Sequence, residues 1–204
     1  MRRQLLTGLR ITICLLVVLG GLYPVAVWGI GRVAFRHQTD GSLVKVGGTV
    51  VGSALIGQNF SDNNGNPLAR YFQPRPSAPT SNGKPDPYDP TNSGGSNLGP
   101  LNADLLKAVA DRVTAYRQFN GLAGDAPVPV DAVTASGSGL DPDISEANAD
   151  DQAKRVAAAR HLDPARVLAL VHAHTNGRAW GFLGENTVNV LDLNLALDRL
   201  SGSP

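Results

Sequence analysis

A run of 21 residues without a charged side chain, residues 11–31, constrains this chain more than any other feature. As an α-helix rising about 1.5 Å per residue it would be roughly 31 Å long, which matches a hydrocarbon core of about 30 Å. A helix in the core of a soluble domain rarely runs so far without a charge. The sequence therefore predicts one transmembrane helix over residues 11–31, preceded by a short N-terminus of residues 1–10.

A cleaved signal peptide is the main alternative to this anchor. The apolar part of a signal peptide has about 7–15 residues, which is shorter than the run seen here. The sequence Gly29-Ile30-Gly31 near its end is only a weak match to a cleavage site. We therefore expect an uncleaved anchor.

Gly20, Gly21 and Pro24 interrupt the apolar run. Small residues let a second helix approach closely, and proline permits a kink. We expect these three residues to contact a partner helix, although glycine and proline are common in membrane helices in any case.

The charges on either side of the run predict its orientation. The flank before it carries three arginines and the α-amino group, whereas the flank after it carries three basic residues together with Asp40. This slight bias places the N-terminus in the cytoplasm under the positive-inside rule, with the single-pass anchor in the cell membrane. The domain that follows would then be extracytoplasmic.

The remainder divides into a linker over residues 32–42 and one soluble domain over residues 43–204. Roughly 160 residues can bury a core without disulfides, and the only cysteine, Cys14, lies inside the apolar run. Beyond residue 37 the chain has 13 basic and 17 acidic side chains. A mildly acidic domain is a poor nucleic-acid binder, so this class of function is excluded.

Local patterns predict an α+β domain. Residues 43–46 and 49–51 flank Gly47-Gly48, a hairpin signal, and the chain continues in an extended pattern over residues 53–60. A further strand is expected at residues 187–191. Apolar spacing and capping residues predict helices at 102–121, 145–160 and 163–177, and a short one at 193–197. Strands with segregated helices indicate the α+β class.

Residues 61–100 form the least regular stretch and hold more than half of the 14 prolines. A structureless loop of about 40 residues is unusual in a compact domain. The stretch is therefore either disordered or held against something, with Tyr71-Phe72 as the expected anchor to the core. Since it has few apolar residues of its own, we expect it to dock on a partner.

Common catalytic and metal-binding patterns are absent, including the Walker A sequence, the G-x-S-x-G elbow and H-E-x-x-H. His172 and His174 are two residues apart, so on a helix they do not share a face. Asp141, Asp143 and Glu146 lack the central glycine of a calcium loop. We therefore predict no catalytic residue and no metal site.

Two Gly/Ser-rich loops, residues 93–97 and 136–139, each precede a predicted helix. Successive backbone N–H groups there could hold an anion, although such turns are common before helices. Two alternative functions stay open. One is an anchored hydrolase that pairs Ser136 or Ser138 with a histidine, and the other is a ligand-binding domain with a closed pocket.

Five motifs occur in a fixed order after the one anchor helix, and they cover most of the chain: residues 53–60, 71–77, 93–100, 133–145 and 187–197. In this order they closely resemble the C subunits of the Kdp potassium-transporting ATPase. The resemblance implies a non-catalytic subunit that raises the affinity of the catalytic subunit for ATP. It also implies three partners: that P-type ATPase subunit, a channel-like potassium-translocating subunit and a small single-span subunit.

The resemblance further implies a nucleotide role for Gln152 and for the loop residues Ser93, Gly94, Gly95 and Ser96. The chain departs from the family at Asp143, where histidine is frequent. The implied ATP contact also conflicts with the orientation predicted from charge, because cellular ATP would not reach an extracytoplasmic Gln152.

Overall fold

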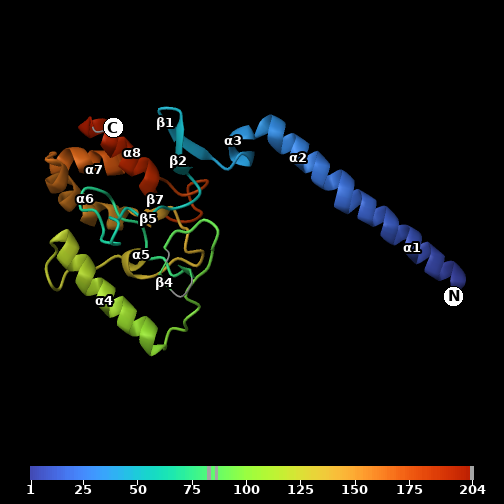
Figure 1. The fold of residues 1–204 in the computed structure, drawn as a ribbon, viewed down its shortest axis with the longest axis horizontal. Helices are drawn as coiled ribbons and strands as arrows, with labels where there is room; N and C mark the ends of the chain where they lie inside the picture. The colour runs from blue at the N-terminus through green and yellow to red at the C-terminus, as the bar shows by residue number, and fades with distance from the viewer. Residues whose placement is uncertain (82–83, 86, 203–204) are drawn as a thin grey trace. The chain divides into compact units, whose positions relative to one another are not determined.

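The computed structural model describes residues 1–81, 84–85 and 87–202, and it divides the chain into two compact units, Met1–Val51 and Gly52–Pro204. Figure 1 shows the elements of both. The first unit holds a long apolar helix and most of a hairpin, whose second strand ends in the second unit, and the second unit holds helices with small sheets. The predicted α+β class with one N-terminal apolar helix is confirmed.

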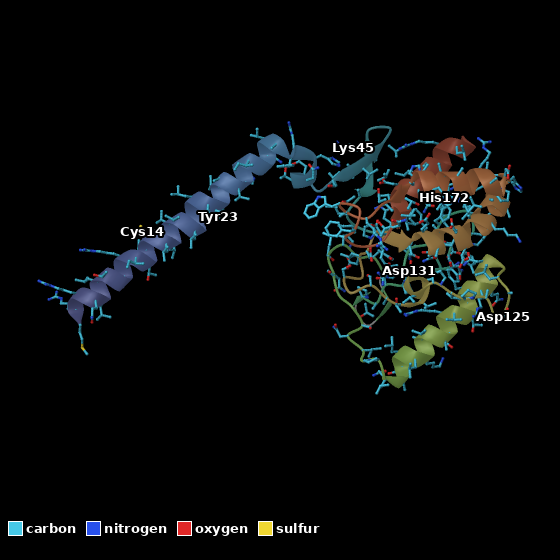
Figure 2. The ribbon with its side chains drawn as sticks, turned by 180° about the vertical axis from the view of Figure 1, so that it is seen from behind. Cys14, Tyr23, Lys45, Asp125, Asp131 and His172 are labelled. Carbon is cyan, nitrogen blue, oxygen red and sulfur yellow. The ribbon has the colours of Figure 1, made fainter. Side chains whose placement is uncertain are left out.

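The apolar run lies within a continuous helix of 33 residues, Arg2–Ala34. It consists of α1 (Arg2–Val17), a π-helical turn η1 (Val18–Leu22) and α2 (Tyr23–Ala34). The helix thus begins nine residues before the uncharged run and is roughly 50 Å long. None of its α1 side chains is buried, and Cys14 and Tyr23 both project outward in Figure 2.

Pro24 accounts for the π turn. Proline lacks the N–H that would bond to the carbonyl four residues back, and its ring collides with that carbonyl, here Gly20. The preceding amide, Tyr23 N–H, donates instead to Val18 O, five residues back. A Cβ atom added at Gly20 or Gly21 would meet nothing within 4 Å, so both glycines leave a shallow surface on the helix.

After α3 (Arg36–Thr39), strands β1 (Leu43–Val46) and β2 (Thr49–Ser53) pair as a hairpin. Gly47 and Gly48 have φ angles of 57° and 85°, the positive values that a two-residue hairpin turn of type I′ needs. The hairpin prediction is confirmed. Over the expected linker, Arg32 and Asp40 form an ion pair.

The second unit is built mainly from helices. They are α4 (Ala103–Asn120), α5 (Val130–Val133), α6 (Glu146–Arg160), α7 (Pro164–Ala173) and α8 (Val190–Ser201). Its strands are β3 (Thr80–Ser81), β4 (Lys84–Pro85), β5 (Asp143–Ser145), β6 (Thr175–Asn176) and β7 (Thr187–Asn189). The last three form an antiparallel sheet in the order β5-β7-β6.

Side-chain caps set the predicted helix starts. The side chains of Asn102, Ser145 and Asp163 accept hydrogen bonds from the first free amides of α4, α6 and α7. These three starts are confirmed. Two ends were predicted wrongly: α7 stops at Ala173 rather than at residue 177, because Thr175 and Asn176 pair with β7. The strand expected over residues 187–191 ends at Asn189, which caps a longer α8.

The extended pattern predicted for residues 53–60 is also wrong, because the chain turns at Ser53–Ile56. Gly57 then lies against other backbone, and its N–H donates to Leu140 O at 2.9 Å. A Cβ atom there would come within 2.6 Å of Asp141 O. Close approach of two backbones, rather than strand pairing, fixes this segment.

The core lies among α6, α7, α8 and the three-stranded sheet. Its fully buried members include Ile144, Val156, Val167, Val188 and Leu193. Phe72, from the Pro-rich stretch, is 0 % exposed and belongs to the same cluster. The expectation that Tyr71-Phe72 anchors this stretch to the core is confirmed for Phe72.

Candidate functional site

Residues 69–73 begin with a turn at Ala69 and Arg70 and continue through the second unit without belonging to a strand. Buried peptide groups need hydrogen-bond partners, and here side chains supply them. Five successive carbonyls accept bonds from α6 and α8: Ala69 and Tyr71 from Arg155, Arg70 from Arg160, Phe72 from Asn194, and Gln73 from Gln152. The segment is thus held by this chain's own helices.

Two buried amides grip consecutive residues of this segment. Asn194 accepts from Phe72 N–H at 2.9 Å and donates to Phe72 O at 3.0 Å. Gln152 does the same to Gln73, at 2.7 and 3.1 Å. An amide group presents an acceptor beside a donor, so it satisfies one residue's backbone much as a neighbouring strand would. We call this pair, Gln152 and Asn194, the amide clamp.

Arg155 connects the amide clamp to helix α4. Its Nη2 donates to Gln152 Oε1 at 2.8 Å, its Nε donates to Asn120 Oδ1 at 2.9 Å, and its guanidinium lies 4.3 Å from the Phe119 ring centroid. Burial lowers the pKa of Arg155 to about 10, so the group stays charged at neutral pH. Cation and aromatic ring together tie α6 to α4.

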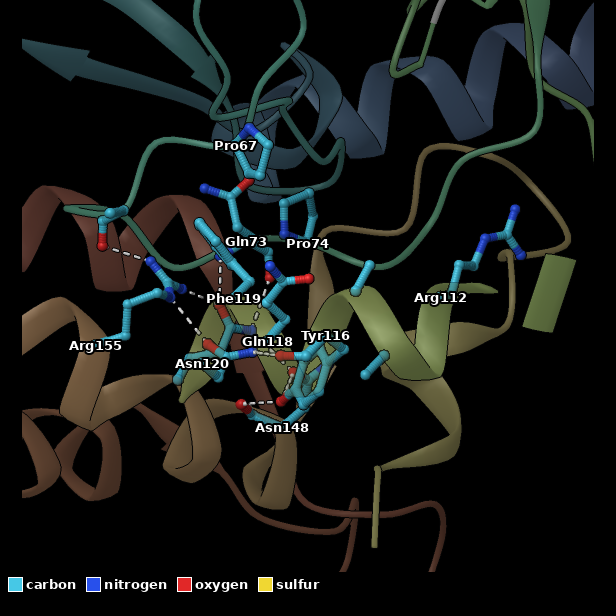
Figure 3. A pocket seen from close by; sticks show the side chains of 14 residues that line it. Pro67, Gln73, Pro74, Arg112, Tyr116, Gln118, Phe119, Asn120, Asn148 and Arg155 are labelled. Carbon is cyan, nitrogen blue, oxygen red and sulfur yellow. Dashed lines mark hydrogen bonds between the residues drawn. The ribbon is translucent and has the colours of Figure 1, made fainter. Parts of the chain in front are cut away.

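A cleft of about 680 Å³ opens beside the clamp, between residues 67–74 and helices α4 and α6. Figure 3 shows Tyr116 of α4 beside Asn148 of α6, and Phe119 and Arg155 also line the cleft. Tyr116 Oη donates to Asn148 Oδ1 at 2.9 Å, and burial raises the pKa of its phenol. The cleft wall is therefore mostly apolar with a few amide groups.

The two Gly/Ser-rich loops lie against each other. Gly94 N–H donates to Ser138 O at 2.8 Å, and Ser93 Oγ donates to the same oxygen at 3.0 Å. A Cβ atom at Gly139 would come within 2.7 Å of Gly94 O. These glycines thus allow two backbones to pack closely. The sequence of neither loop predicts this tertiary contact.

The residues tied to nucleotide by resemblance occupy two different places. Gln152 is 2 % exposed, and its amide makes four hydrogen bonds, to both backbone groups of Gln73, to Arg155 and to Asn148. The loop of Ser93 to Ser96 packs on Ser138 instead. The amide of Gln152 and two donors of the loop, Ser93 Oγ and Gly94 N–H, are thus engaged within the chain itself.

The serine–histidine pair needed by a hydrolase is not formed by the residues we singled out. Ser138 Oγ accepts from Leu140 N–H, and Ser136 Oγ is buried with no hydrogen-bond partner in the described part of the chain. His172 Nδ1 lies 3.3 Å from Glu146, and His174 Nδ1 lies 2.9 Å from Leu170 O. The hydrolase alternative therefore loses its main support.

The acidic residues weighed as a calcium loop have structural partners. Asp141 pairs with Arg75 at 2.8 Å, and its other oxygen accepts from Asp143 N–H. Asp143 accepts from Thr187 and Asn189, both at 3.2 Å. Burial, more than the neighbouring Asp141, raises the pKa of Asp143. These carboxylates brace the junction of β5, β7 and α8.

Comparison with known families decides what this scaffold is. The family model described as the K⁺-transporting ATPase c chain, KdpC, matches residues 5–199. The chain belongs to the KdpC family. The match spans both the apolar helix and the clamped domain, so the family covers most of the chain.

Curated KdpC relatives are similar over nearly the full length. A potassium-transporting ATPase KdpC subunit of Mycobacterium tuberculosis (strain ATCC 25618 / H37Rv) is 54 % identical over 200 residues, which is 98 % of this chain and 100 % of that protein. The KdpC subunit of Kineococcus radiotolerans is 54 % identical over 197 residues, or 96 % and 93 % of the two chains. That of Variovorax paradoxus is 55 % identical over 185 residues, or 90 % of each.

Proposed function

We propose that this chain is the non-catalytic C subunit of a potassium-transporting ATPase complex and stabilises that complex from a single membrane anchor. The observation that carries the proposal is the KdpC match over residues 5–199, which takes in the apolar helix as well as the domain. The partners are the three that the resemblance implies: the catalytic P-type subunit, the channel-like potassium-translocating subunit and the small single-span subunit.

Complementation tests this role directly. Cells that lack their own C subunit but keep the other subunits are given this chain and grown with limiting potassium. We expect growth to be restored, and we expect a variant without residues 2–34 to fail although its domain is made. Growth without the full chain, or no growth with a chain that is present in the membrane at normal level, would contradict the proposal.

We further propose that the N-terminus is cytoplasmic and the domain extracytoplasmic. The slight excess of positive charge before the apolar run supports this orientation. A reporter enzyme that is active on only one side of the membrane, fused after residue 204, measures it. Activity on the cytoplasmic side would refute the orientation.

The resemblance implies an effect on the ATP affinity of the catalytic subunit. With the domain extracytoplasmic, this effect would pass through contacts with the partner subunits rather than through nucleotide bound to this chain. The side-chain amide of Gln152 already makes four hydrogen bonds within the chain, which supports this indirect route. Photolabelling of the assembled complex with an azido-ATP tests it, since label should appear on the catalytic subunit and not on this chain. Labelling of this chain that excess ATP prevents would overturn the indirect route.

We also propose that the Pro-rich stretch docks on another subunit, but only through its C-terminal end. Phe72 and Tyr88 are buried in the chain's own domain, so the stretch does not need a partner there. Leu98 and Leu101 remain 39 % and 91 % exposed, and we propose that this end contacts another subunit. Hydrogen exchange over residues 93–101 should slow on assembly, and equal exchange in free and assembled protein would defeat the idea.

A ligand-binding role is the second candidate, favoured by the cleft beside the clamp. Its volume of about 680 Å³ falls in the range of small-molecule sites, which is roughly 300–1,000 Å³. A screen for compounds that raise the thermal unfolding temperature of the full chain would detect such a ligand. Loss of that effect in Phe119→Ala would locate it in the cleft.

A further inference from the structure

Residues 178–183, between β6 and β7, form a turn that the proposed function does not use. Trp180, Phe182 and Leu183 are 85 %, 68 % and 47 % exposed. Three large apolar side chains within four residues are rarely left in water without a purpose. We call residues 178–183 the aromatic tip.

The aromatic tip is a formed turn. Ala179 and Leu183 exchange backbone hydrogen bonds at 2.9 and 3.0 Å, and Gly181 N–H donates to Arg178 O at 3.0 Å. Trp180 has a φ of 53°, a left-handed conformation that is unfavourable for a bulky residue. The backbone thus holds Trp180 outward at a cost in conformational energy, which indicates a preorganised contact.

The aromatic tip itself carries one charged residue. Arg178 is exposed, and the nearest acidic residue along the sequence, Glu185, follows two residues after the tip. An arginine guanidinium beside exposed aromatic rings can pair with the phosphate of a lipid headgroup while the rings enter the apolar region.

The size of the aromatic tip also favours lipid over protein. Its exposed apolar side chains offer on the order of 400 Å², since a large aromatic side chain presents about 150–250 Å². A stable protein interface buries about 800 Å² on each partner, twice that area. Insertion of one tryptophan and one phenylalanine at a lipid–water interface needs no larger surface, and tryptophan is enriched there.

The anchor makes even a weak contact of this kind effective. Seventeen residues, 35–51, separate the end of α2 from the second unit. Fully extended they span at most about 60 Å, so the domain cannot leave the neighbourhood of the bilayer. Tethering converts insertion into an intramolecular step at high effective concentration.

We infer that the aromatic tip inserts Trp180 and Phe182 into the lipid–water interface of the membrane that the chain's own helix spans. The insertion holds the domain at a defined distance from the bilayer through a second contact besides the anchor. Arg178 lies at the level of the headgroups beside it.

Tryptophan fluorescence of the full chain in vesicles tests the inference. The chain has two tryptophans, so Trp28→Phe leaves Trp180 as the sole reporter, and Trp28→Tyr serves if that variant inserts poorly. The vesicles contain phosphatidylglycerol with ordinary or brominated phosphatidylcholine. We expect brominated lipid to quench Trp180 and aqueous acrylamide to quench it only weakly, and Arg178→Glu to reduce the lipid quenching.

Two results would overturn the inference. The first is strong acrylamide quenching of Trp180 with no effect of brominated lipid, because the tip would then lie in water. The second is protection from both quenchers only when the other subunits are present, because the tip would then contact protein. The double variant Trp28→Phe, Trp180→Phe supplies the background signal for every measurement.

Discussion

The amide clamp makes a strong prediction for Gln152→Ala. The substitution removes the partners of both backbone groups of Gln73 and leaves Arg155 and Asn148 with fewer bonds. An unsatisfied buried polar group costs about 1–3 kcal/mol, so two backbone groups give about 2–6 kcal/mol. Arg155 and Asn148 keep other partners, and their losses add little.

Water from the adjacent cleft reduces this cost. Gln73 and Gln152 both line the cleft, so a water molecule can replace part of the lost amide. We therefore expect the free energy of unfolding to fall by about 2–4 kcal/mol, which is a large fraction of the 5–15 kcal/mol typical of a domain.

Urea titration of the full chain in detergent micelles measures the effect, followed by far-ultraviolet circular dichroism. The midpoint should fall while the slope with urea stays the same, because the folded core is retained. Gln118→Ala is the matched control, since Gln118 is an exposed glutamine on α4 that lines the same cleft. That variant should change stability by less than about 0.5 kcal/mol.

Hydrogen exchange supplies a local readout of the same substitution. In Gln152→Ala the backbone amides of residues 69–73, Arg75 and Ser77 should exchange faster. Amides of α7 should change little, apart from the change set by the lower global stability. Equal urea midpoints for the Gln152 and Gln118 variants, with unchanged exchange in this segment, would refute the clamp. A loss of ATP affinity in the complex without any loss of stability would favour a nucleotide role for Gln152.

Three further substitutions test other parts of the fold. Asp143→Asn should flatten the pH dependence of the free energy of unfolding. Burial raises the pKa of Asp143 in the folded state, so the stabilising contribution of its protonated form is fully present below the ordinary pKa of about 3.8 and is lost as pH rises through the folded pKa. Urea titrations across that pH range measure the effect. Gly139→Ala should lower the thermal unfolding temperature, because its φ is 69° and a Cβ atom would lie 2.6 Å from Pro79, whereas exposed Gly124→Ala should have little effect. Ser145→Ala should cost about 1–2 kcal/mol in the same urea assay, since it removes both the α6 cap and a bond to Asp131.

The parts of the fold that sequence predicts are those fixed by neighbouring residues. Capping side chains at Asn102, Ser145 and Asp163 act within one helical turn, so the starts of α4, α6 and α7 follow from local pattern. The Gly47-Gly48 hairpin is equally local. The end of α7 was missed because pairing with β7, a tertiary event, decides it.

The candidate site could not be predicted in the same way. Gln152 and Gln73 are 79 residues apart, and no pattern in either segment signals that one amide replaces a strand for the other. The two Gly/Ser loops read separately as anion cradles, yet each serves to admit the backbone of the other. In both cases the fold uses these residues in contacts that only the folded chain brings together.

The position of Asn194 in the sequence has a consequence for how the protein is made. Asn194 lies 122 residues after the Phe72 backbone that it holds. During synthesis the segment around Phe72 emerges early. The side-chain amide of Asn194 can bond to it only after α8 has been synthesised. Closure of such a long loop is slow, and the waiting apolar segment is exposed meanwhile. A nascent chain stopped before residue 190 should remain sensitive to protease near residue 72, so the emergence of α8 is the event that completes the amide clamp.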